Sequence, residues 1–289
     1  MQPAPFSSAS WKVRILHAEH FRGKTLIQRF SNHQPIPRTI GIVGGLGPYA
    51  GYDLVRKIFR WTKASSDQDH LPLMLHSFPG WIPERPAFLL GEKKENPGED
   101  IGAIMAQLAK NGAQVIGMPC NTAHSPRILN VALNRLHETG LDVTFVSIIE
   151  SAVKHIRSLC PHGGRIGLMG TVATLQTGLY QNALKKADLE PVLPNDEQCR
   201  LVQQAISSPE FGIKSFSDPV TSRARGILLD TARGLAEKKH VSTILLGCTE
   251  IPVAVTESSL CDIPVVDATS VLARELIRAS CPERLKSSC

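Results

Sequence analysis

Short apolar runs alternate along this chain with longer segments in which apolar residues recur every three or four positions. Two of the runs, at 113–119 and 241–247, are largely apolar and lack the alternation of a half-exposed strand. Segment 49–61 shows helical spacing, with Leu54 and Ile58 on one face. Further helical segments are expected at 98–112 and 218–239. Continuous apolar strands between amphipathic helices predict an α/β fold with parallel sheets covered on both faces.

The pattern occurs twice. The strand and Gly-rich turn that begin at Arg38 return at Arg165, with Ile40-Gly41 aligned on Ile166-Gly167. The interval from Gly41 to Cys120 is 79 positions, and that from Gly167 to Cys248 is 81. A third matched element, strand then polar residue then helix, is expected at 143–158 and at 263–280.

This repetition indicates a doubled unit, and therefore two similar Rossmann-like domains. We expect a pseudo-twofold axis to relate the domains, with the active site in the cleft between them. The predicted first domain comprises residues 39–141 plus 257–281, and the second comprises residues 142–256.

The net charge of +6 comes almost entirely from one end of the 289-residue chain. Residues 1–38 hold six Lys or Arg and one Glu, which leaves 26 basic and 25 acidic residues in the rest. A nearly neutral body without a basic, aromatic stripe predicts no nucleic-acid partner. We expect residues 1–38 to be a disordered basic extension, with an organelle transit peptide as the alternative. No stretch has the apolar length of a membrane span.

The seven cysteines form an odd set without a C-x-x-C pair, which favours free thiols in a reducing, cytoplasmic setting over a disulfide framework. Cys120 and His124, four positions apart, are the one weak indication of zinc. A closed metal site needs further ligands that the spacing does not supply, so no metal is expected. The cysteines are Cys120, Cys160, Cys199, Cys248, Cys261, Cys281 and Cys289.

Cys120 and Cys248 both follow a predicted strand and precede residues able to begin a helix. A thiol at a helix N-terminus has a lowered pKa, and the free N–H groups there bind carboxylates. Asn121, Thr122 and Thr249 are candidate caps for these helices. Two proton-exchanging thiols on opposite faces of a carbon are what stereoinversion requires, so the pair indicates a racemase or epimerase. The alternative is that both cysteines are ordinary core residues.

The Gly-rich turn at 44–48 raises the question of a nucleotide. Its glycines do not have the G-x-G-x-x-G spacing of dinucleotide-binding turns, and Pro48 stands in the loop. We therefore expect this turn, with Gly47, to line a small-molecule pocket and to require no cofactor. A non-catalytic protein that binds an acid or a nucleotide is the alternative from another functional class.

These motifs together resemble the aspartate/glutamate racemase family, most closely its aspartate racemase branch. The resemblance rests on IGIVGGLGP after Thr39, PCNTAH around Cys120 and GCTE around Cys248. It implies a cofactor-independent enzyme with two similar α/β domains and with Cys120 and Cys248 as the two acid/base groups. It also implies that the segment of Asn121, Thr122 and Ala123 holds the substrate α-carboxylate, with Thr249 and Thr171 nearby.

Two cations are implied by the same resemblance. IPERP supplies Arg85 and GIKSF supplies Lys214, which would hold the side-chain carboxylate of a dicarboxylic amino acid. Ser215-Phe216 replaces the family's small residues after the lysine, which leaves aspartate and glutamate both open. The predicted partner is thus an acidic amino acid, and a homodimer is compatible with the sequence. A related decarboxylase or isomerase of another small acid is the alternative enzyme.

Overall fold

The computed structural model describes residues 36–287. The expected basic extension falls almost entirely within residues 1–35 and so lies outside the described residues, as does Cys289. In the part that is described, no helix is both long and apolar enough to cross a membrane.

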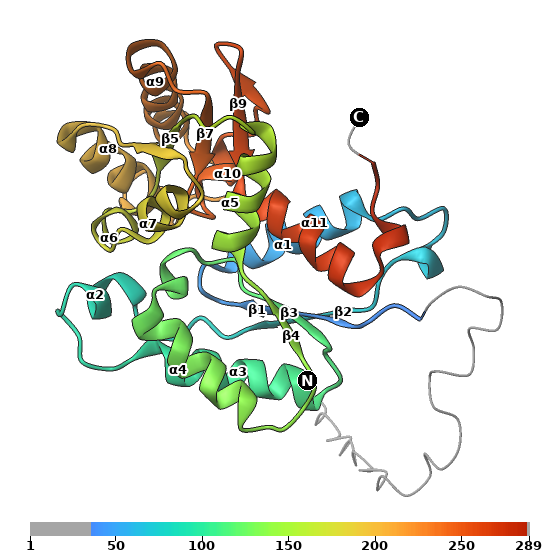
Figure 1. Ribbon diagram of the computed structural model, residues 1–289. Helices are drawn as coiled ribbons and strands as arrows, with labels where there is room; N and C mark the ends of the chain where they lie inside the picture. The colour runs from blue at the N-terminus through green and yellow to red at the C-terminus, as the bar shows by residue number, and fades with distance from the viewer. Residues whose placement is uncertain (1–35, 288–289) are drawn as a thin grey trace, which may run out of the picture. The chain divides into compact units, whose positions relative to one another are not determined.

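The first sheet has four parallel strands in the order β2-β1-β3-β4. Helices α3 and α4 cover one face, and α1 and α11 cover the other (Figure 1). The strands are β1 (Ile40–Gly44), β2 (Leu73–Ser77), β3 (Val115–Gly117) and β4 (Thr144–Val146). The helices are α1 (Pro48–Trp61), α2 (Arg85–Leu89), α3 (Pro97–Lys110), α4 (Pro126–His137) and α11 (Ala268–Ser280), with the short 3-10 helices η3 (Asp67–Asp69), η4 (Thr122–His124) and η5 (Pro282–Arg284).

The second sheet repeats this order with β6-β5-β7-β9, again parallel, and adds the antiparallel strand β8 at the edge. Its strands are β5 (Arg165–Met169), β6 (Glu190–Val192), β7 (Thr243–Leu246), β8 (Ser259–Leu260) and β9 (Ile263–Asp267). Its helices are α5 (Ile148–Leu159), α6 (Val172–Gln176), α7 (Leu179–Lys186), α8 (Asp196–Ser207), α9 (Ser222–Lys239) and α10 (Ile251–Ala254). The prediction of an α/β fold with repeated parallel sheets is confirmed.

Strand register places the two cysteines at equivalent points. Gly41 of β1 pairs with Ile116 of β3, and Gly167 of β5 pairs with Ile244 of β7. Each cysteine follows its paired isoleucine by four positions, beyond the carboxyl end of the central strand. Loops at the carboxyl ends of parallel strands are where such sheets place their functional groups.

The sheets divide the strands differently from the predicted domain boundaries. Strand β4 pairs with β3 in the first sheet, although its residues were expected in the second domain. Strand β9 pairs with β7 in the second sheet, although its residues were expected in the first. The boundary at 142 thus needs to move past β4, and that at 257 past both β8 and β9. Strands β4 and β9 thus each stay in the sheet of their own repeat. Only the helices that follow them, α5 and α11, pack against the other sheet.

One apolar core joins the two sheets. Helix α11 follows β9 of the second sheet but packs on α1, β3 and β4 of the first. Helix α5 follows β4 of the first sheet and contacts α7 and β9 of the second. The resulting cluster includes Ile42, Leu168 and Leu276, all fully buried. Because both sheets contribute to one core, the packing of this cluster sets how their carboxyl ends face each other.

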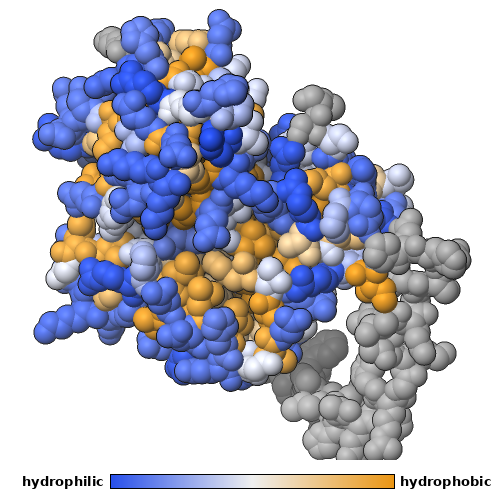
Figure 2. Space-filling view, in the orientation of Figure 1, coloured by the Kyte–Doolittle hydropathy of each residue, from blue (hydrophilic) through white to orange (hydrophobic). Residues whose placement is uncertain are grey.

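The surface follows the expected amphipathic pattern. Hydrophilic side chains cover much of the face drawn in Figure 2, and an apolar area lies in its middle. Apolar side chains of α4, α5 and α7 line a groove, among them Leu129, Val153 and Leu179. The helical segment after β5 is broken into α6 and α7 at Gly178, which adopts the left-handed conformation with φ of 66°.

Candidate active site

Cys120 and Cys248 line one narrow cavity at the carboxyl ends of the two sheets. Both side chains are buried, with 7% and 6% of their surface exposed. The structure thus brings these two predicted site residues together at one cavity. The cavity is lined by Leu46, Arg85, Pro86, Cys120, Asn121, Thr122, Thr171, Lys214, Cys248, Thr249 and Glu250.

Cys120 is positioned by a histidine that contacts its backbone. The ring Nδ1 of His124 lies 2.8 Å from the carbonyl oxygen of Cys120, and the backbone N–H of Ile148 donates to Nε2 over 3.4 Å. Nδ1 must therefore carry the proton and donate. Burial lowers the pKa of His124 to about 4, so the ring is neutral. With both nitrogens engaged by backbone, His124 is structural and does not take a proton from the Cys120 thiol.

Cys248 lies beside a carboxylate. Its thiol donates to Oε2 of Glu250 at 2.9 Å, and the hydroxyl of Thr249 donates to the same oxygen at 3.4 Å. Burial raises the pKa of Cys248 well above its ordinary value, and the negative charge of Glu250 raises it further.

The expectation that a helix N-terminus lowers the pKa is wrong for Cys248. The helix after Cys248 is α10, which has four residues, and the one after Cys120 is the three-residue η4. Neither is long enough for a substantial dipole. No capping hydrogen bond is made by the Asn121 side chain, and the Thr249 hydroxyl bonds to Glu250 instead.

Polar side chains from both sheets meet at the cavity wall. The hydroxyl of Thr174 lies 3.0 Å from that of Thr122 and 2.9 Å from that of Thr171, which links the two cysteine-bearing sides. Tyr180 donates from its hydroxyl to Oδ1 of Asn121 at 2.7 Å. Burial raises the pKa of Tyr180, so it keeps this proton. The amide nitrogen Nδ2 of Asn121 is buried and has no protein partner, so it is a donor available to a ligand.

Two cations border the same cavity. Arg85 begins α2 and is only 8% exposed. It donates from Nη2 to the carbonyl of Leu46 at 2.5 Å and from Nη1 to that of Pro83 at 3.4 Å, whereas its buried Nε has no partner. Within residues 36–287, no ion pair joins Arg85 or Lys214 to a carboxylate. Lys214 is exposed.

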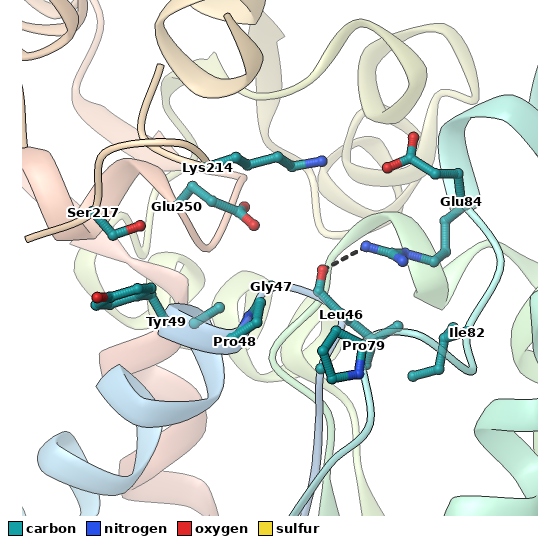
Figure 3. Close-up of a pocket in the computed structure, with 13 residues that line it drawn as sticks. Leu46, Gly47, Pro48, Tyr49, Pro79, Ile82, Glu84, Lys214, Ser217 and Glu250 are labelled. Atoms are coloured by element: carbon teal, nitrogen blue, oxygen red, sulfur yellow. Dashed lines mark hydrogen bonds between the residues drawn. The ribbon is translucent and has the colours of Figure 1, made fainter. Parts of the chain in front are cut away.

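A wider pocket of about 300 Å³ adjoins the cysteine cavity and shares four of its residues: Leu46, Arg85, Lys214 and Glu250. Figure 3 shows Lys214, Glu250 and Glu84 extending into it from different loops. Gly47 lines this pocket, as the sequence predicts for the Gly-rich turn. A Cβ on Gly47 would lie 2.4 Å from Oε1 of Glu250, so glycine at this position lets the carboxylate occupy its observed place.

Other residues are placed differently from the sequence-based expectation. Ala123 is fully buried in the apolar cluster of the first sheet, and its side chain does not line the cavity. Glu250, Thr174 and Tyr180 are at or behind the cavity wall but were not predicted as site residues. The sequence carried one signal for Glu250, its position two residues after Cys248. The described residues contain no group of three or more His, Cys, Asp or Glu arranged to hold a metal.

Comparisons with known proteins identify the family of this chain. The profile of the Asp/Glu/hydantoin racemase family matches residues 43–276. The chain is 27% identical over 246 residues to the broad specificity amino-acid racemase RacX of Bacillus subtilis, which covers 82% of this chain and 96% of that protein.

Two solved structures have a similar fold. The aspartate racemase of Picrophilus torridus is 27% identical, with a TM-score of 0.68 over 84% of this chain and 94% of that one. An aspartate racemase homologue from Pyrococcus horikoshii is 22% identical and shares the fold, with a TM-score of 0.62 over 84% and 98% of the two chains. The chain therefore belongs to the Asp/Glu/hydantoin racemase family, and the prediction that it is an amino-acid racemase by type is confirmed.

Proposed function

We propose that this chain is a cofactor-independent racemase of acidic amino acids in which Cys120 and Cys248 are the two proton-transfer groups. One observation carries the proposal: both thiols line the same cavity, each from the matching end of a repeated sheet. A tetrahedral carbon bound between them would present opposite faces to the two sulfur atoms.

The proposed reaction needs one thiolate and one thiol. The thiolate removes the proton from Cα, and the opposite thiol delivers its proton to the other face, so that the protein ends with the same number of protons in exchanged positions. Negative charge spreads from Cα into the substrate α-carboxylate during this step. The unpartnered Nδ2 of Asn121 is a donor suited to that carboxylate. Because Thr174 has one hydroxyl proton and bonds to both Thr122 and Thr171, one of these two hydroxyls is a second donor to the ligand.

The preference for an acidic side chain rests on Arg85 and Lys214. A buried guanidinium without a carboxylate partner is costly, and an anionic ligand would offset that cost. Arg85 lines both the cysteine cavity and the adjoining pocket, as does Lys214, so a side-chain carboxylate could reach both cations. Because the Bacillus subtilis relative is a broad specificity amino-acid racemase, other amino acids should be tested as well.

The test is racemisation of D- and L-aspartate and D- and L-glutamate followed by chiral chromatography, with Cα–H exchange in D2O as a second readout. Cys120→Ala and Cys248→Ala should each abolish racemisation while circular dichroism and the Tm stay close to wild type. A double variant that still interconverts enantiomers would end the two-cysteine proposal. A protein that only binds acids would show thermal stabilisation by ligand without exchange at Cα.

Arg85→Met tests the side-chain site. It should raise the KM for aspartate and glutamate strongly, by the roughly 10- to 100-fold expected for losing a charge-assisted contact of about 1.5–3 kcal/mol. Racemisation of an uncharged amino acid, if the pocket admits one, should be affected less. An equal effect on charged and uncharged substrates would contradict the assignment. A homodimer, a cytoplasmic location and the two-domain division stay predictions from the sequence.

A further inference from the structure

The two thiols occupy chemically different surroundings. Cys248 donates to Oε2 of Glu250, whose side chain is only 7% exposed. In the described part of the chain, no side chain makes a hydrogen bond to the Cys120 thiol, and His124 contacts the carbonyl of Cys120 instead. The two matching halves of the fold thus give their cysteines different surroundings.

The charges facing Cys248 favour its thiol form. Glu250 is the nearest anion and accepts the thiol proton in a hydrogen bond, while Lys214 is the cation that opposes it. Arg85 also lines the cavity, but its guanidinium donates to the carbonyls of Leu46 and Pro83. A thiolate at Cys248 would be buried next to a carboxylate and would lose the hydrogen bond it now donates. Both effects disfavour the charged sulfur.

We propose that Glu250 is the positioning residue that keeps Cys248 protonated in the free enzyme, so that Cys248 is the resting proton donor and Cys120 the resting base. This inference rests on the proposed function. The enantiomer whose Cα–H faces Cys120 then meets a ready enzyme form. The other enantiomer requires the form in which Cys120 holds the proton and the Cys248 thiolate lies beside the Glu250 carboxylate, which is less populated.

Three features of the site place Glu250 beside Cys248. The Thr249 hydroxyl donates to the same oxygen, Oε2, that accepts from Cys248. The other oxygen, Oε1, occupies space that a side chain at position 47 would fill. The carboxylate also lines both the cysteine cavity and the adjoining pocket.

The first experiment measures the ionisation of Cys248 without requiring activity. The wild-type protein and Glu250→Gln are treated with iodoacetamide across a pH series, and peptide mass spectrometry gives the extent of reaction at Cys248. Because glutamine is isosteric but neutral, the pH of half-maximal reaction should fall by about 1–2 units. In the wild type it should lie above that of free N-acetylcysteine, and this second measurement needs no variant to fold.

A matched control comes from the surface pair of Cys261 and Glu237, in which the thiol donates to Oε1 at 3.3 Å. Glu237→Gln neutralises the carboxylate beside the Cys261 thiol and should leave the reaction profile of Cys248 unchanged. An unshifted Cys248 profile in Glu250→Gln, or an equal shift in Glu237→Gln, overturns the inference.

The second experiment measures the activity of each thiol by itself. In Cys120→Ala only Cys248 can act as base, and in Cys248→Ala only Cys120 can, so exchange at Cα in D2O reports each thiol alone. Adding Glu250→Gln should move the pH profile of exchange to lower pH in the Cys120→Ala background and leave it unchanged in Cys248→Ala. An equal shift in both backgrounds, or a raised KM with no shift, would assign Glu250 to substrate binding and overturn the inference. If wild-type protein shows no exchange with any amino acid tested, the proposed function fails, while the alkylation result on Glu250 still holds.

Discussion

Gly47→Ala should disable the site while sparing the fold. The added Cβ would lie 2.4 Å from Oε1 of Glu250, and its next contact, with Ala50, would be an ordinary 3.6 Å. Gly47 has φ of 165°, an extended conformation that alanine also adopts, so the backbone itself is not strained. The collision therefore falls on one flexible carboxylate, which must move by roughly 1 Å to reach normal van der Waals distance.

The size of the effect follows from what that movement breaks. Displacing Glu250 weakens the 2.9 Å hydrogen bond from Cys248, a contact to a charged group worth about 1.5–3 kcal/mol. If the enzyme form with a protonated Cys248 thiol loses that stabilisation, kcat/KM should fall by roughly 10- to 100-fold. The free energy of unfolding should change by no more than about 1 kcal/mol, because the end of a flexible side chain can shift at little cost.

The assay is racemisation of aspartate and glutamate in both directions, together with urea denaturation. Since two enantiomers have an equilibrium constant of one, kcat/KM must fall by the same factor in each direction, which is an internal check. Gly80→Ala is the matched control, because a Cβ there meets no atom within 4 Å. Wild-type kcat/KM in Gly47→Ala, or a loss in Gly80→Ala of the same size, would refute the reasoning.

Two further predictions concern stability. Lys57→Met should lower the free energy of unfolding by about 3–5 kcal/mol, measured by urea denaturation, because it removes the cation shared by the buried Asp53 and the partly buried Asp267. A loss below about 1 kcal/mol would contradict it. His124 has a folded pKa of about 4 against an ordinary 6.5, so the unfolded chain binds its proton first as the pH falls. Stability contributed by neutral His124 is complete above pH ~6.5 and should decline by about 3 kcal/mol toward pH ~4, and this part of the decline should vanish in His124→Gln.

The repeated fold was predictable because its signals are local. A continuous apolar run, a Gly-rich turn and the following helical spacing each lie within about twenty residues of chain, and their recurrence with similar intervals fixed the pairing of Cys120 with Cys248. The sheet against which α5 or α11 packs could not be deduced in the same way. Both are amphipathic helices after a strand, and nothing in their own spacing says which sheet supplies the apolar surface they cover.

The site residues likewise divide into those with a local sequence signal and those placed by long-range packing. Arg85 and Lys214 were named from motif position, and the structure places both at the cavity. The lowered pKa expected from a helix N-terminus failed because helix length depends on where the chain turns next, and α10 ends after four residues. The contact of Gly47 with Glu250 joins positions 203 apart, which no local pattern could indicate.

The unlike pair of thiols follows from one position in the repeat. Two residues after the first cysteine stands Thr122, whose hydroxyl reaches Thr174 across the cavity wall. Two residues after the second stands Glu250, whose carboxylate accepts from the thiol of its own segment. Matching backbones bring the two sulfur atoms to one cavity, as a reaction at both faces of a carbon requires. On the proposed mechanism, equal thiols would leave both thiols ionised or both protonated in much of the free enzyme. A single carboxylate beside one of them avoids this, because it holds the proton on one side.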